Sequence, residues 1–128
     1  MSAAPIGVLV VDDEPLLRWA LSEVLTSRGC EVVQAGDSRT AIQALGDRTA
    51  GQFDVVVLDY HLPDAHDLSL LATTRRVSPH SHVIMLTALM PPAEIARALA
   101  LGASHVVQKP IEMDVFAALV LGADSAPH

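Results

Sequence analysis

The sequence predicts one α/β domain in which five parallel strands form a doubly wound sheet with helices on both faces. Two observations lead to this prediction. Five short runs rich in Val, Ile and Leu are separated by segments whose apolar residues recur with the period of a helix. Regular alternation of strand-like and helix-like segments is typical of a parallel sheet, because each crossover between parallel strands needs a long connection.

The five strand-like runs are short and rich in β-branched residues, without an alternating pattern, as expected of strands that are covered on both faces. They span residues 6–11, 31–35, 53–58, 82–86 and 105–108. Four of the five end directly before a polar residue. The carboxyl ends of parallel strands share one edge of a sheet, and ligands bind there, so we expect these polar residues to meet in one site.

Helical segments fill the intervals between the strands. After Pro15, which suits the first turn of a helix, an apolar stripe runs along one side until Gly29 ends the helix. The stripe consists of Leu17, Ala20, Leu21, Val24 and Leu25. Four further helices are predicted over residues 38–48, 67–77, 91–101 and 112–121.

Length and composition fit one compact domain. The chain has 128 residues, of which 51% are hydrophobic, so it can bury a sizeable core. We take residues 1–122 as the domain and expect residues 123–128 to form a loosely ordered tail. No apolar run is long enough to span a membrane, the start does not resemble a signal peptide, and Cys30 is the one cysteine. These features predict a cytoplasmic protein that does not bind membranes.

The charge balance bears on possible partners. Eight basic residues stand against fifteen acidic ones, for a formal net charge of −7. This excess of negative charge argues against nucleic-acid binding by this domain alone.

The polar residues at the strand ends suggest phosphoryl chemistry. Asp12 and Asp13 follow the first run, and Asp59, Thr87 and Lys109 each follow one of the others. Crowded carboxylates repel one another unless a cation neutralises them, and a small set of oxygen ligands favours Mg²⁺. Asp59 could then serve both as a ligand and as a nucleophile toward phosphorus. A lysine and a hydroxyl would hold the remaining phosphoryl oxygens.

Four stretches carry a resemblance to a known family, and they cover nearly the whole chain in the right order. They are Val10-Val11-Asp12-Asp13-Glu14-Pro15, Val57-Leu58-Asp59-Tyr60-His61-Leu62-Pro63-Asp64, Leu86-Thr87-Ala88 and Lys109-Pro110. With these stretches the chain resembles the receiver domain of two-component response regulators. The resemblance implies a flavodoxin-like sheet with strand order 2-1-3-4-5 and a cis bond between Lys109 and Pro110.

The resemblance also implies a role for each site residue. Asp59 is expected to accept a phosphoryl group from a histidine kinase or a histidine phosphotransfer protein. Mg²⁺ would be bound by Asp13 and Asp59 directly, by Asp12 through water, and by the backbone carbonyl of His61. Thr87 would be the switch hydroxyl, and Lys109 would bind the phosphoryl group. Such a domain is not an enzyme in the usual sense, since it catalyses only its own phosphorylation and slow dephosphorylation.

Two sites depart from the usual pattern of this family. Val106 stands where an aromatic side chain usually moves together with the threonine, and a valine reports that movement poorly. His66-Asp67 replaces a common Asp-Gly pair, so Asp67 is a candidate N-cap of the third helix. His61 and Leu89 occupy positions that tune dephosphorylation in the family.

Two surfaces are candidates for partner binding. Trp19 lies nearly opposite the apolar stripe of the first helix, so we expect it to be exposed and available to a kinase or phosphotransfer partner. The fourth helix is apolar around much of its circumference, which makes Ile95 and Leu99 candidates for contact with an output domain or a second copy. Such a contact would use the fourth helix, fifth strand and fifth helix. The fifth helix offers Glu112 and Asp114 with no arginine of its own, so the contact should be mainly hydrophobic.

Two other classes of protein could use a similar sheet. A Mg²⁺-dependent phosphatase with an aspartyl nucleophile, like the haloacid-dehalogenase-like enzymes, needs a second Asp two residues after the first, where this chain has His61. A flavin or nucleotide carrier needs a hydroxyl- or glycine-rich loop after the first strand, where this chain has Asp12, Asp13 and Glu14. The phosphorylation-switched signalling domain is therefore the preferred interpretation.

Overall fold

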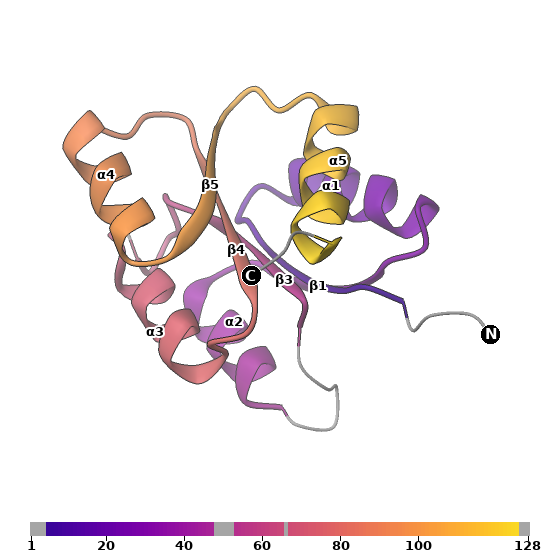
Figure 1. The fold of residues 1–128 in the computed structure, drawn as a ribbon, viewed down its shortest axis with the longest axis horizontal. Coiled ribbons are helices and arrows are strands. Elements are labelled where there is room, and N and C mark those ends of the chain that lie inside the picture. The colour runs from indigo at the N-terminus through magenta and orange to yellow at the C-terminus, as the bar shows by residue number, and fades with distance from the viewer. Residues whose placement is uncertain (1–4, 48–52, 66, 126–128) are drawn as a thin grey trace.

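A computed structural model describes residues 5–47, 53–65 and 67–125 of the chain, and five strands alternate with five helices along them (Figure 1). The strands pair in the order β2-β1-β3-β4-β5, and every pair is parallel. The predicted doubly wound, flavodoxin-like sheet is thus confirmed. The elements are β1 (Gly7–Val11), α1 (Pro15–Ser27), β2 (Glu31–Ala35), α2 (Ser38–Gly46), β3 (Val55–Asp59), α3 (Ser69–Val77), β4 (His82–Thr87), α4 (Pro92–Ala100), β5 (Ala103–Gln108) and α5 (Met113–Ser125).

Alternate residues of the central strands face opposite layers of helices. On one side, Leu9 and Val56 pack with the apolar residues of α2, α3 and α4. On the other side, Val8 and Val57 pack with those of α1 and α5. Figure 1 shows α1 and α5 next to each other on one side of the sheet, with α2, α3 and α4 on the other. Burial on both faces explains why these strands are continuously apolar.

The two edge strands are an exception to the expected burial. β1, β3 and β4 are buried almost throughout, but most residues of β2 and β5 are exposed or half-buried. The expectation that all five strands would be covered on both faces was therefore wrong for β2 and β5. Each of them pairs with only one neighbour and is covered less completely by the helices.

The helix boundaries differ from the prediction by one to four residues, and the differences in α3 and α5 concern residues singled out in the sequence. α3 begins at Ser69 rather than at residue 67, because the Asp67 carboxylate accepts a hydrogen bond from the Ser69 N–H and holds a turn before the helix. The N-cap position is Leu68, without a side-chain hydrogen bond, so the prediction that Asp67 caps this helix was wrong. α5 continues to Ser125, so helix extends into the predicted tail, whose last residues, 126–128, lie outside the described part.

The sheet brings the carboxyl ends of β1, β3, β4 and β5 to one edge. Lys109 follows β5, and its N–H donates to the carbonyl of Thr87 at the end of β4 (2.7 Å). The bond between Lys109 and Pro110 is cis, as the resemblance implied. Among the described residues, no helix combines the length and the apolar character needed to cross a membrane.

Candidate functional site

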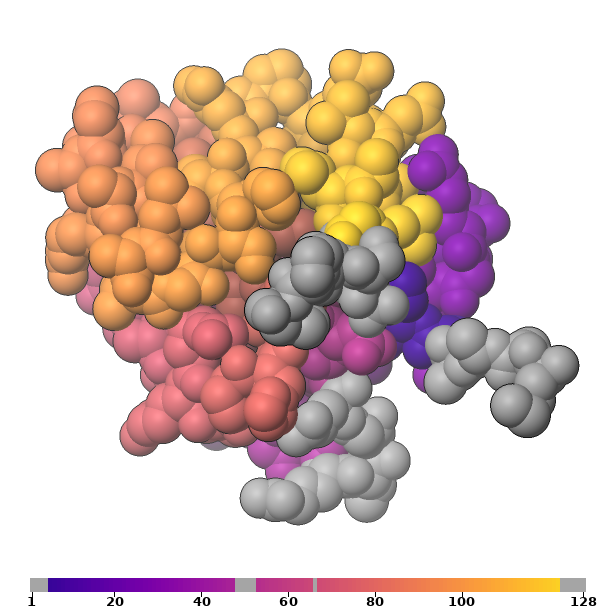
Figure 2. Space-filling view, in the orientation of Figure 1, coloured from indigo at the N-terminus to yellow at the C-terminus, as the bar shows by residue number. Residues whose placement is uncertain are grey.

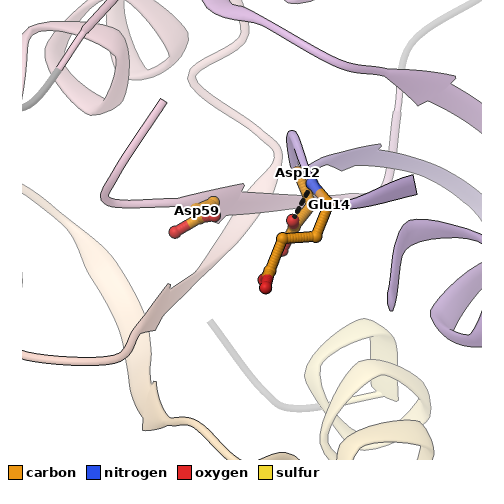
Figure 3. A group of neighbouring side chains, drawn as sticks. All are labelled: Asp12, Glu14 and Asp59. Carbon is orange, nitrogen blue, oxygen red and sulfur yellow. Dashed lines mark hydrogen bonds between the residues drawn. The ribbon is translucent and has the colours of Figure 1, made fainter. Parts of the chain in front are cut away.

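Three carboxylates meet at this edge of the sheet. Asp12 follows β1, Asp59 ends β3, and Glu14 precedes α1. One oxygen from each can be chosen so that all three lie within 4.8 Å of one another, and Figure 3 shows Asp12 and Glu14 beside Asp59. The Glu14 N–H donates to Asp12 Oδ1 (2.8 Å), which fixes the connection between β1 and α1. Asp12 and Asp59 were predicted here from the sequence, whereas Glu14 was not.

Lys109 is the cation of this acidic group, and it is the one lysine of the chain. Its Nζ lies 2.7 Å from Glu14 Oε2, 3.1 Å from Asp59 Oδ2 and 3.2 Å from Asp12 Oδ2. Asp12 and Asp59 are almost completely buried, whereas the Glu14 side chain is exposed. Three carboxylates and one ammonium leave an excess of negative charge in a largely buried place.

The protonation equilibria reflect this crowding. Burial is the main reason why the pKa values of Asp12 and Asp59 are raised, and for Asp12 repulsion from Asp59 adds to the effect. Hydrogen bonds from the Glu14 and His61 N–H groups oppose these increases. Burial alone would lower the pKa of Lys109, but its contacts with Glu14, Asp59 and Asp12 raise it far above the usual range. Lys109 is therefore fixed as a cation.

The carboxylate group fits a divalent cation. Asp12 Oδ2 is buried, and although it lies in ion-pair contact with Lys109, it has no hydrogen-bond partner within the described residues. All the available donor atoms are oxygens, which Mg²⁺ and Ca²⁺ prefer. A second cation would relieve the repulsion that raises the pKa of Asp12 and Asp59.

Two predicted metal ligands lie outside this three-carboxylate group. Asp13 is exposed, and its charge contributes to raising the pKa of Asp59, so it lies close to the group on the solvent side. The N–H of His61 donates to Asp59 Oδ1 (3.1 Å), which orients the carboxylate. Metal binding by Asp13 and by the His61 carbonyl stays a prediction.

Thr87 ends β4, the strand next to Asp59, and Val106 lies in β5, which pairs with β4 at the edge of the sheet. The Thr87 side chain is 3% exposed, and its hydroxyl oxygen has no hydrogen-bond partner in the part of the chain that the structure describes. Val106 pairs with Met85 in β4 and lines a pocket together with Thr87. The predicted switch pair is therefore adjacent in space, with a hydroxyl that is free to take up a new acceptor.

Sequence reasoning missed three supporting residues. Glu14 was noticed only as part of an acidic helix start, although its place after β1 could have suggested contact with Lys109. Arg18 Nη1 donates to the carbonyl of Asp12 (2.8 Å), and its Nε donates to Gln34 of β2 (3.2 Å). The Tyr60 hydroxyl donates to Glu94 of α4 (2.9 Å) and so connects the segment after Asp59 to that helix. The last two contacts depend on side-chain direction, for which the sequence carries no signal.

The predicted partner-binding residues are partly accessible. Trp19 is 58% exposed, as expected, and Leu16, one turn earlier on α1, is 84% exposed. Leu99 is 48% exposed, but Ile95 is half-buried against the core that contains Val106. Asp114 forms an ion pair with Arg28 at the end of α1 (2.9 Å). The fifth helix lacks an arginine of its own, as predicted, but the first helix supplies one.

This edge of the sheet, with its acidic group, its lysine and its buried hydroxyl, defines a phosphoryl-accepting signalling domain. The family model for the response regulator receiver domain matches residues 8–121, and the chain belongs to that family. Receiver domains bind a divalent metal at an acidic group, which agrees with the three carboxylates found here.

Curated relatives include two regulators from Mycobacterium tuberculosis. The probable transcriptional regulatory protein TcrX is 37% identical over 110 residues, which cover 86% of this chain and 46% of that protein. The transcriptional regulatory protein KdpE is 37% identical over 118 residues, which cover 91% of this chain and 50% of that protein. The chain thus spans about half the length of the curated relatives it matches.

Solved structures give the same result. The receiver domain of the putative response regulator NarL from Mycobacterium tuberculosis is 27% identical with a TM-score of 0.84, over 98% of this chain and all of that one. A response regulator from Burkholderia pseudomallei, determined with a phosphorylated aspartic acid, a calcium ion and citrate, is 28% identical with a TM-score of 0.81. That match covers 94% of this chain and 69% of the other.

Proposed function

We propose that Asp59 accepts a phosphoryl group from a phosphohistidine of a histidine kinase or phosphotransfer protein. The observation that carries the proposal is the Asp59 carboxylate, buried at the end of β3 with Oδ1 held by the His61 N–H and Oδ2 facing Lys109. In the transfer, an Asp59 oxygen forms a bond to phosphorus while the bond from phosphorus to the histidine nitrogen breaks. The Burkholderia relative carries a phosphorylated aspartic acid, which supports this assignment.

The surrounding residues provide charge and orientation for the transfer. Mg²⁺, bound by Asp12, Asp13, Asp59 and the His61 carbonyl, would neutralise charge on the phosphoryl group. Lys109 would turn from Glu14 toward a phosphoryl oxygen, and the Thr87 hydroxyl would donate to another. Val106 cannot follow Thr87 as a ring would, so the signal transmitted through β5 should be weak. The domain would catalyse only its own phosphorylation and its slow hydrolysis.

The phosphatase alternative receives no support from the site. An aspartyl-nucleophile phosphatase needs an acid two residues after the nucleophile to protonate the leaving group. His61 occupies that position, and its ring is exposed and in hydrogen-bond contact with the carbonyl of Leu89 (3.1 Å). A ring held against a neighbouring loop is not directed at a leaving group on Asp59.

Phosphorylation by acetyl phosphate tests the proposal without a partner. We expect the wild-type domain to gain one phosphoryl group in the presence of Mg²⁺ and to gain none with a chelator. Asp59→Asn should abolish the gain, while Asp54→Asn, which changes an exposed aspartate directly before the same strand, should leave it unchanged. Full labelling of Asp59→Asn in intact-mass spectra would refute the assignment.

We infer that Trp19 and Leu16 form the contact for the phosphodonor protein. Both are exposed, and they lie three residues apart on α1, next to the acidic site. The proposed transfer places the domain in the cytoplasm, where kinases have access to ATP. Output domains and second copies would instead contact Leu99 and the surface formed by α4, β5 and α5, which Figure 2 shows side by side.

Trp19→Ala should slow transfer from a phosphohistidine protein about tenfold, the effect of losing an interface anchor. Labelling by acetyl phosphate should stay unchanged, because this small donor needs no docking surface. Ile42→Ala is a matched control, since it removes an exposed apolar side chain from α2 on the other face of the sheet. Equal slowing with both donors would indicate a folding defect and would remove support for the docking role.

A further inference from the structure

A small pocket lies between β5, the start of α4 and the segment that follows β4. Its volume is about 180 Å³, and it is lined by Thr87, Leu89, Met90, Ile95, Val106 and Gln108. It is separate from the three-carboxylate group, with Thr87 at the boundary between the two. Leu89 is largely exposed whereas Met90 is buried, so the pocket leads from the surface toward the core.

The lining selects for an uncharged molecule. Four of the six side chains are apolar, and Thr87 and Gln108 are polar but uncharged. Glu94 and Lys109, which are next to lining residues in the chain, have partners of their own. Glu94 accepts from Tyr60 (2.9 Å) and from Arg97 (2.6 Å), and Lys109 faces the carboxylates. An ion would lose its hydration in this pocket without gaining an opposite charge.

The Thr87 hydroxyl is the one hydroxyl group among the described residues that line the pocket. Its oxygen is buried and has no hydrogen-bond partner among the residues that the structure describes. A buried hydroxyl without a partner is costly, so a molecule that offers one hydrogen-bonding group gains by meeting it. Rotation of the Thr87 side chain between its staggered positions can present the hydroxyl to the pocket.

The volume sets the size of the ligand. Drug-sized ligands occupy pockets of roughly 300–1,000 Å³, whereas an apolar cavity of about 150 Å³ holds one benzene molecule. We propose that this pocket is a binding site for a small uncharged ring that carries one hydroxyl group, of which phenol is the simplest example.

A regulatory consequence follows, and it rests on the proposed function. If phosphorylation draws the Thr87 hydroxyl toward a phosphoryl oxygen, the bound ring loses its hydrogen-bond partner. Ligand binding and phosphorylation then oppose each other, and by linkage the ligand weakens the phosphorylated state by the same factor. Benzene, which lacks the hydroxyl, is affected less.

Titration with phenol and with benzene, followed by backbone amide and methyl NMR, tests the site. We expect saturable shifts with phenol at the lining residues. Val106→Phe places a ring in the pocket and should weaken phenol binding at least about tenfold. Val33→Phe adds the same ring on β2 at the opposite edge of the sheet and should leave binding unchanged. Ile95→Phe fills the pocket from α4 and replaces Val106→Phe if that variant does not fold.

Two further measurements test the Thr87 hydroxyl and the link to phosphorylation separately. Thr87→Val should weaken phenol binding about three- to tenfold without weakening benzene binding. Beryllofluoride with Mg²⁺ should weaken phenol binding to the wild type. The binding site would be refuted if phenol caused no saturable shifts at the pocket, or if Val33→Phe weakened phenol binding as much as Val106→Phe does. The role of the hydroxyl would be refuted if Thr87→Val bound phenol as tightly as the wild type. Failure of beryllofluoride to shift the resonances around Asp59 would count against the proposed function while leaving phenol binding in its absence intact.

Discussion

Lys109 holds together a group of side chains that would otherwise repel one another. Its amine contacts Glu14, Asp59 and Asp12, and the latter two are buried. The domain therefore accepts strain at this site in the absence of a metal, as sites prepared for charged ligands commonly do. Glu14, the exposed partner, is the contact that Lys109 can exchange most easily for a phosphoryl oxygen.

This crowding predicts that Asp59→Asn stabilises the metal-free protein at pH 7 by about 1 kcal/mol, a usual size for one substitution. The raised pKa of Asp59 means that the folded state binds its proton more tightly than the unfolded state does. Stability is therefore lost as pH rises from the unfolded pKa through the folded one. The advantage of Asp59→Asn should be full above the folded pKa and should vanish below the unfolded pKa.

Thermal unfolding between pH 3 and 8 with a chelator provides the measurement (roughly the range over which carboxylates titrate). Mg²⁺ should raise the midpoint of the wild type more than that of Asp59→Asn. A variant that is less stable than the wild type at pH 7 without metal would show that the contact with Lys109 outweighs the repulsion.

At the scale of elements, hydrogen bonds connect the start of α2 to the loop that follows β3, the strand that ends at Asp59. Asp37 is the N-cap of α2, and its carboxylate accepts a hydrogen bond from the Thr40 N–H (2.7 Å). Asp64, from the loop after β3, accepts from the N–H groups of Ser38 (2.9 Å) and Arg39 (3.1 Å). These two carboxylates satisfy the free N–H groups of the first turn and complement the helix dipole.

Asp64→Asn should therefore lower the unfolding midpoint at neutral pH. Hydrogen bonds donated by the N–H groups of Ser38 and Arg39 lower the pKa of Asp64, and those from Thr40 lower the pKa of Asp37. A lowered pKa contributes stability that is present above the unfolded pKa and is lost as pH falls through the folded one. The difference between Asp64→Asn and wild type should thus shrink under acid conditions. A difference that stays constant from neutral to acid pH would contradict a role for the charge.

Strand positions and strand-end residues could be predicted from the sequence, but the coverage of the edge strands and the contact of Glu14 could not. The apolar runs identified all five strands, and for β1, β3 and β4 burial on both faces explains the pattern. The same pattern could not show that β2 and β5 would be less covered, since that depends on the order of the strands. Asp12, Asp59, Thr87 and Lys109 were found because strand ends share an edge. Glu14 was missed because its contact depends on the direction of a side chain beyond the strand.

At the scale of the whole molecule, the surface of α4, β5 and α5 is the candidate for association. Leu99, Leu101 and Val115 are all at least 40% exposed there. The charges of α4 are paired with each other, Arg97 with Glu94, and Asp114 is paired with Arg28, which follows α1. Contacts through this surface should consequently depend on apolar burial more than on charge.

We predict that beryllofluoride with Mg²⁺ promotes self-association through this surface and that high salt does not abolish it. Leu99→Glu should reduce the association at least about tenfold, because it places a charge in an apolar contact. Ile42→Glu, which adds the same charge to an exposed position on α2, is the control. Light scattering measures both. Association that disappears in high salt and ignores Leu99→Glu would locate the contact elsewhere and make it electrostatic.

The most direct test of the phosphoacceptor assignment is to locate the phosphoryl group on the chain. Acetyl phosphate labels the domain in the presence of Mg²⁺, and borohydride then reduces an aspartyl phosphate to homoserine, which peptide mass spectrometry can place. We predict reduction at residue 59 alone, with none at Asp12, Asp13 or Asp54 and none when a chelator is present. Reduction at any of those other aspartates, or undiminished reduction without metal, would contradict the account.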